Sequence, residues 1–249
     1  MKFKNNARMF WEKHRIAIVI SYILIYLFWF KYIESSVTTH FHIIHMPLDD
    51  FIPFCEFFIV PYILWFAYVA CGAIYFFFHD HDDFYRLCIF LATGMTVFLI
   101  ISTIYPNGHY LRPYYFTRDN VFIDLCKMIY GSDTPTNLFP SIHVYNSIGI
   151  HIAVQKCKGF KHPKLVKTLS GILATSIILS TMFVKQHSVF DVVCAFILAI
   201  IMYQIVYVSN LVVDSAGAPA YARSVGMPAS YSRKQKKSLQ RSVRRTESR

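Results

Sequence analysis

Charged residues are scarce in this chain of 249 residues. Asp, Glu, Lys and Arg make up 16% of it, whereas hydrophobic residues make up 55%. Soluble domains carry about 25% charged residues. The shortage of charge therefore argues against a soluble protein and favours one that lies in a bilayer.

The chain holds six apolar runs of about the length that a transmembrane helix needs. The runs cover residues 16–32, 54–78, 87–105, 141–155, 165–184 and 188–208. The fourth run is the shortest and the most polar. We expect an all-α polytopic membrane protein with a six-helix bundle over 16–208 and short loops. A basic cytoplasmic arm over 1–15 and a disordered basic tail over 209–249 complete the expected organisation.

Cysteine pairs and clear metal-ligand clusters are also missing. The six cysteines form no CxxC pair, so we predict no disulfide framework. The histidines at 40, 42 and 45 lack an evident fourth ligand, and we interpret this segment as an interfacial loop. The acidic stretch HDHDD at 79–83 could hold a metal, but we expect it on the opposite side of the membrane from the candidate site. No metal or cofactor is predicted for that site.

Basic residues are unevenly distributed. All but five of the 25 Lys and Arg residues fall on one predicted side of the membrane, which places both termini in the cytoplasm by the positive-inside rule. The five on the other side are Lys31, Arg112, Arg118, Lys127 and Lys185. Because the charge is spread over the loops of an apolar bundle, nucleic acid is not an expected partner. The tail either binds anionic lipid headgroups or serves only as a topology anchor.

Polar residues suited to phosphate chemistry fall on the predicted external face. Arg112 offers a planar set of donors for phosphate oxygens, although a lone Arg at a helix end is more often an anchor. Ser141 follows Pro140 at a predicted helix start, where free N–H groups favour anions. His143 lies one turn further, and its ordinary pKa near 6.5 suits proton donation. A structural cap with an interfacial histidine remains an equal alternative for this segment.

His187 and Asp191 are four residues apart, so they share one face of a helix. A carboxylate there can fix one imidazole nitrogen and leave the other as a nucleophile. A polar clamp between helices is the alternative. Together with the arginine, serine and second histidine, this pair predicts a site that binds an anion, attacks phosphorus and protonates the departing oxygen.

These residues resemble the signature of the phosphatidic acid phosphatase type 2 superfamily. The matching segments are LRP at 111–113, PSIH at 140–143 and STMFVKQHSVFD at 180–191. The pattern is closest to inositol phosphorylceramide synthase-like proteins and related bacterial members, and the likeness covers about residues 50–208. It implies an integral protein of a bacterial plasma membrane with its site on the extracytoplasmic face.

The resemblance also implies a metal-independent reaction on a lipid phosphate. In it, His187 attacks phosphorus and is oriented by Asp191, while Arg112 and Ser141 stabilise the charge. His143 protonates the leaving alcohol, and a phosphohistidine then passes its phosphoryl group to water. In a lipid phosphotransferase an alcohol replaces water. A catalytically weak lipid-binding scaffold is the third possibility.

Two positions depart from the superfamily pattern. Tyr105 stands where a lysine is expected, and Thr181 stands where an arginine is expected. We expect Lys185 to supply one of the missing positive charges and a protonated His109 to supply another. Residues expected behind the site are Glu56, His109 and Ser180, and a helix-entry anchor is the alternative for Glu56.

Overall fold

The computed structural model describes residues 2–37 and 40–209, with side chains described at His14 and from Ile16 on. The interpretation of 210–249 as a disordered, headgroup-binding tail lies outside the described residues. Ile16–Ser209 forms one compact unit, and this unit is the part described below.

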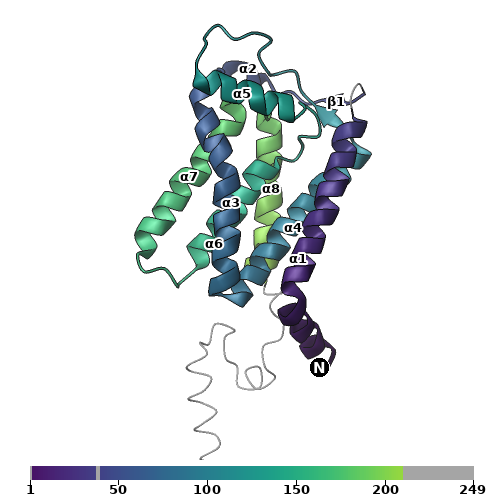
Figure 1. Cartoon of the computed structure of the whole chain (residues 1–249), viewed down its shortest axis with the longest axis vertical. Helices are drawn as coiled ribbons and strands as arrows, with labels where there is room; N and C mark the ends of the chain where they lie inside the picture. Colours follow the sequence, from purple (N-terminus) through teal and green to yellow (C-terminus); the bar gives the residue numbers. More distant parts are fainter. Residues whose placement is uncertain (1, 38–39, 210–249) are drawn as a thin grey trace, which may run out of the picture. The chain divides into compact units, whose positions relative to one another are not determined.

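Six long helices dominate this unit (Figure 1). They are α1 Lys2–Ser36 (in this unit from Ile16 on), α3 Ile59–His79, α4 His81–Ile104, α6 Ile142–Lys156, α7 Pro163–Phe183 and α8 Val189–Tyr203, the last extended by a π-helical turn over Gln204–Val208. Each overlaps one of the six apolar runs of the sequence, although α1 and α4 begin well before their runs. The helical fold class is therefore confirmed.

Within the described residues, five helical segments are long and apolar enough to cross a membrane. They are Ile16–Ser36, Glu56–His79, His81–Ile104, Pro163–Phe183 and Val189–Val208. The helix α6 is not among them. With 15 residues it is about 22 Å long, and the hydrocarbon core is about 30 Å thick. The structure thus supports five spanning helices and one shorter polar helix.

The short helix α6 lies at the centre of the bundle, packed against α3, α4, α7 and α8. Glycines permit this close packing. A Cβ added at Gly94 of α4 would lie 2.0 Å from the Tyr145 ring, and one added at Gly149 of α6 would lie 2.7 Å from Phe90. Tyr145 stacks on Phe90 at 4.7 Å between ring centroids and donates its hydroxyl to the Phe90 carbonyl at 2.8 Å. A polar helix is therefore shielded from lipid by its neighbours.

The helix α4 begins at His81, six residues earlier than its apolar run. Asp80 is the N-cap, and its side chain accepts the N–H groups of Asp82 and Asp83 at 2.8 and 3.0 Å. Acidic residues in a first turn are also favoured by the helix dipole. The HDHDD stretch therefore belongs largely to the start of a helix and not to a loop.

Five short elements gather at the end of the bundle where α6 begins, at the top of Figure 1. They are β1 His42–Ile43, α2 Pro47–Phe51, the 3-10 helix Glu56–Phe58, β2 Asn107–Gly108 and α5 Val121–Ser132. The two strands pair in parallel, with His42 opposite Asn107. The Asn107 side chain accepts the N–H groups of Leu138 and Phe139 at 2.9 and 3.0 Å, which fixes the segment leading into α6.

Candidate active site

The turn between α7 and α8 carries His187 and fixes it from two sides. The N–H groups of Gln186 and His187 both donate to the Thr181 carbonyl, at 2.9 and 3.0 Å. His187 Nδ1 lies 3.3 Å from Asp191 Oδ2, and the same oxygen accepts the Ser188 N–H at 3.0 Å. Both His187 and Asp191 are buried. The carboxylate engages one ring nitrogen, which leaves Nε2 for chemistry.

His143 lies in the first turn of α6, and its ring is held by aromatic contacts. Its centroid is 4.7 Å from that of Tyr62, 4.1 Å from that of Trp65 and 5.7 Å from that of His187. Both ring nitrogens are buried, and neither has a hydrogen-bond partner within the described part of the chain. Buried polar atoms in native proteins are seldom left unpaired. These nitrogens therefore mark a place where a ligand's polar atoms can bind, next to His187.

Ser141 is the N-cap of α6. Its Oγ accepts the Val144 N–H at 3.4 Å, and its own N–H lies 3.4 Å from the Asp191 carbonyl oxygen. The side chain is fully buried. Ser141 thus connects the helix that carries His143 to the helix that carries Asp191, which brings the two histidines together.

Arg112 is held by the end of α5 and by the α7–α8 turn. Its Nη1 donates to the carbonyls of Tyr130 and Asp133 at 3.3 and 2.8 Å, and its Nη2 donates to Gln186 Oε1. The guanidinium also lies 4.5 Å from the centroid of the Tyr130 ring. Its Nε is buried with no partner among the residues described. Arg112 is therefore linked through Gln186 to the turn that bears His187, and its role in binding phosphate stays a prediction.

Lys185, which we expected to supply a second positive charge to a phosphate, is engaged elsewhere. Its Nζ donates to the Asp49 carbonyl at 2.8 Å, so the ammonium group is bound to α2. Burial lowers its pKa, and the charges of Asp49 and Asp50 oppose this effect. Lys185 is close to His187 in the sequence, but the contact of its ammonium group is set by α2, which packs against the α7–α8 turn.

Asp49 is a buried residue at this same turn that the sequence analysis missed. Its carboxylate accepts the Ser188 hydroxyl at 2.6 Å and the N–H groups of Val189 and Met46 at 2.7 and 2.8 Å. An anion at the start of α8 is favoured by the helix dipole. Asp49 is about 140 residues from its α8 partners in the sequence, so no local pattern could have indicated the contact.

His109 is fully buried and uses both ring nitrogens. Its Nδ1 accepts the Leu111 N–H at 3.2 Å, so the remaining nitrogen, Nε2, donates to the Gln186 carbonyl at 3.0 Å. An imidazolium could not accept at Nδ1. Burial lowers the pKa of His109 to about 4. His109 is thus a neutral support of the α7–α8 turn, and the expectation that it supplies a positive charge does not fit these contacts.

Glu56 and Ser180 support neighbouring elements. Glu56 Oε1 lies 3.1 Å from Arg118 Nη1 and 3.3 Å from the Nδ2 of Asn120, the N-cap of α5. Ser180 donates its hydroxyl to the Ile177 carbonyl at 2.6 Å within α7. Glu56 therefore anchors α5, and Ser180 is a buried residue of α7 near the turn.

The two positions that depart from the superfamily pattern carry no charge into the site. The Tyr105 ring stacks on His42 with 4.0 Å between centroids. Thr181 is fully buried and donates its hydroxyl to the Ile178 carbonyl at 2.8 Å. Neither residue supplies the positive charge that a basic side chain would bring at its position.

Three further polar residues belong to this region and were not singled out from the sequence: Gln186, Asp133 and Glu34. Burial and the charge of Glu34 raise the pKa of Asp133 to about 6, against the opposing effect of Arg112 and His187. Glu34, near the end of α1, accepts the Thr134 N–H at 2.9 Å. The sequence did not single out these three residues because each lies in a segment without a regular pattern or at the end of an apolar run.

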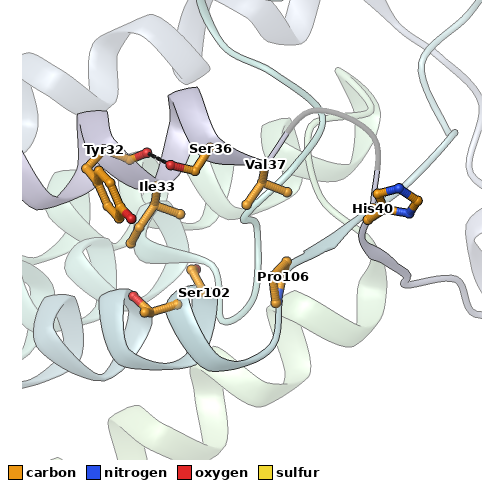
Figure 2. A pocket seen from close by; sticks show the side chains of 8 residues that line it. Tyr32, Ile33, Ser36, Val37, His40, Ser102 and Pro106 are labelled. Carbon is orange, nitrogen blue, oxygen red and sulfur yellow. Dashed lines mark hydrogen bonds between the residues drawn. The ribbon is translucent and has the colours of Figure 1, made fainter.

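Two other features of the bundle lie apart from these residues. A cavity of about 290 Å³ lies between the ends of α1 and α4, lined by Ile33, Ser102 and Pro106 among others (Figure 2). None of the candidate catalytic residues lines it. Within the described residues, no group of three or more His, Cys, Asp or Glu side chains is arranged to hold a metal ion.

The chain was compared with protein-family models, with curated proteins and with solved structures. None of the three comparisons gives a match.

Proposed function

We propose that this protein is a membrane lipid phosphate phosphatase of the phosphatidic acid phosphatase type 2 kind, acting through a phosphohistidine at the extracytoplasmic end of the bundle. One observation carries the proposal. The rings of His143 and His187 lie 5.7 Å apart, His187 is oriented by Asp191, and the buried nitrogens of His143 have no partner among the described residues. One phosphate ester can contact both rings at this separation.

The reaction would proceed in two steps. His187 Nε2 attacks phosphorus as its P–O bond to the lipid breaks, and His143 gives a proton to the departing alkoxide. Asp191 stabilises the positive charge that develops on His187. Water then attacks the phosphohistidine, His143 takes the water's proton, and the N–P bond breaks to release phosphate. Arg112 stabilises the charge on the phosphoryl oxygens in both steps.

A lipid phosphotransferase is the second candidate. It would use the same first step, and an alcohol would replace water in the second. The arrangement that favours this candidate is the single guanidinium of the site, because the two positions expected to add cations hold Tyr105 and Thr181. A less highly charged site suits a phosphate that already carries a second ester.

The test is release of phosphate by the purified protein in detergent from phosphatidic acid, isoprenyl pyrophosphate and sphingoid phosphate, with EDTA present. His187→Ala should reduce the rate at least about 10³-fold, since it removes the nucleophile. His45→Ala is the matched control, because His45 is an exposed histidine that pairs with Asp50 outside the site. Equal rates for the His187 variant and the parent would refute the proposed nucleophile.

If no phosphate is released from any substrate, the transferase candidate is tested with a phospholipid donor and a lipid alcohol acceptor. Transfer that depends on His187 would then replace hydrolysis as the activity. Absence of both reactions would contradict the proposal and leave a lipid-binding scaffold.

A further inference from the structure

Gln186 holds a hydrogen-bond donor that the proposed reaction has not yet used. The residue is 1% exposed and directly precedes His187. Its Oε1 accepts from Arg112 Nη2, and because a guanidinium can only donate, this contact fixes which end of the amide is oxygen. The Nε2 group is buried, and it has no acceptor in the part of the chain that the structure describes. A buried amide donor without an acceptor is uncommon and costly, so it indicates a ligand oxygen.

The backbone of Gln186 is fixed on both sides. Its N–H donates to the Thr181 carbonyl at 2.9 Å, and its carbonyl accepts from His109 Nε2 at 3.0 Å. The side chain is fixed by Arg112. Gln186 therefore presents a preorganised neutral donor beside the nucleophile, in a region where the superfamily pattern would supply an arginine at the Thr181 position.

The basic side chains near this end of the bundle are mostly occupied. Arg118 lies 3.1 Å from Glu56, and Lys127 lies 3.1 Å from Asp124. Lys185 donates to the Asp49 carbonyl at 2.8 Å. Lys31 is exposed on α1. Among the basic side chains described, Arg112 is thus the one that donates to the Gln186 side chain in the turn that carries His187.

The charge of Arg112 is itself opposed by acidic groups. Asp133 and Glu34 both interact electrostatically with its guanidinium. His109 is neutral, and Asp191 pairs with His187. The titratable groups around this space are Arg112, Asp133, Glu34, Tyr62, Tyr130, His109, His143, His187 and Asp191. Three carboxylates therefore surround a single guanidinium, so the site holds no excess of fixed positive charge.

We infer that the site accepts the phosphoryl group of its substrate as a monoanion, held by one charged donor, Arg112, and one neutral donor, the Gln186 amide. This inference rests on the proposed function for the identity of the site. A dianion would lack the second cation that stabilises it, whereas a monoanion matches the donors present. Two lipid sources carry a monoanionic phosphate: a phosphodiester at any physiological pH, and a phosphomonoester that retains one proton.

The first test measures binding and does not depend on turnover. Dissociation constants for phenyl phosphate and methyl phenyl phosphate are measured with the purified protein in detergent, by phosphorus NMR titration at pH 5.5 and pH 8.5. The second proton of a phosphate monoester is lost near pH 6, whereas the diester remains a monoanion. Because both probes meet the same ionisable groups of the protein, the ratio of the two constants reports the charge preference of the site.

From pH 5.5 to pH 8.5, we expect the binding of phenyl phosphate to weaken at least about tenfold relative to the binding of methyl phenyl phosphate. If phenyl phosphate instead binds more tightly relative to methyl phenyl phosphate at pH 8.5, the site prefers the dianion and the inference is overturned. Failure of both probes to bind at millimolar concentration would also overturn it.

The second test asks whether Gln186 is the donor. Gln186→Met removes the amide at similar volume and should weaken binding of both probes about 10-fold to 100-fold. Gln155→Met is the control, because Gln155 is exposed near the opposite end of α6. Unchanged binding by a folded Gln186→Met variant would exclude the amide as a ligand.

Release of diacylglycerol from phosphatidic acid and from phosphatidylglycerol separates the two sources, since both lipids give this product. Cleavage of phosphatidylglycerol identifies a diester substrate. If only phosphatidic acid is cleaved, and its cleavage rate falls above pH 6 while the diester probe still binds, the substrate is a protonated monoester. If neither these two lipids nor the other phosphates and the donor–acceptor pair named above react, but the binding ratio changes as expected, the proposed function fails while the charge preference stands.

Discussion

Asp49 shows how much of this site is built by single residues distant in sequence. Its two carboxylate oxygens accept from Ser188, Val189 and Met46, and its carbonyl accepts from Lys185. The residue is 2% exposed. Through these contacts α2 holds both ends of the turn in which His187 lies.

Replacing Asp49 by alanine should therefore destabilise the folded protein. The change would leave a buried hydroxyl and two N–H groups without their acceptor, at a cost of at least about 2 kcal/mol. Thermal unfolding in detergent, followed by tryptophan fluorescence, would measure the loss. Asp50→Ala is the matched control, because Asp50 is 66% exposed and its contact with His45 is a surface pair worth little. Identical melting temperatures for the two variants would contradict this account of Asp49.

At the residue scale, short spacings were the reliable part of the sequence. The four-residue separation of His187 and Asp191 led us to expect a contact on one helix face, and the contact forms. His187, however, lies in the turn before α8, so the capping turn at Ser188 and not a shared helix brings the two side chains together. The position of Lys185 two residues from His187 predicted nothing useful, since its ammonium group binds Asp49 on another element. Contacts of this second kind depend on tertiary folding, which a single sequence does not display.

At the scale of elements, apolar runs predicted where the long helices lie but not how they end. The start of α4 was placed six residues late because its first turn is polar and capped by Asp80. The helix α5 was not predicted, since its 12 residues lie between polar loops and form no long apolar run. Both misses concern segments whose structure depends on caps and on packing over the bundle end.

The contact between α4 and α6 gives the prediction that belongs to this scale. Gly94→Ala should destabilise the bundle by about 1–3 kcal/mol, because the new Cβ would lie 2.0 Å from the Tyr145 ring and the neighbouring rings are fully buried. Gly131→Ala in α5 is the control, since a Cβ there meets no atom within 4 Å. Chemical denaturation in detergent would compare the two. A Gly94 variant as stable as the control would mean that α4 and α6 can separate without cost.

For the whole molecule, the five apolar spanning segments support a membrane protein, while its orientation stays a prediction from loop charge. Cysteine labelling in intact cells would test it. Tyr114 is 93% exposed near the candidate site, and Lys161 is exposed in the turn between α6 and α7. A membrane-impermeant maleimide should label Tyr114→Cys from outside and Lys161→Cys only after the cells are opened.

The parent chain supplies the background for this experiment, because it already holds six free cysteines. His109 lies near Tyr114 in the sequence, but its buried position makes it unsuitable for labelling. Labelling of Lys161→Cys but not Tyr114→Cys in intact cells would reverse the predicted orientation.

The placement of α6 has a consequence for how the proposed reaction is measured. The helix begins beside the first turn of α8, since the Ser141 N–H lies 3.4 Å from the Asp191 carbonyl oxygen, so in the proposed reaction His143 would meet lipid phosphates at the end of the bundle where α8 begins. Substrate would then arrive by sideways diffusion within the leaflet, without leaving it. Rates should accordingly follow the mole fraction of substrate in a micelle or vesicle and stay constant when the bulk volume is diluted.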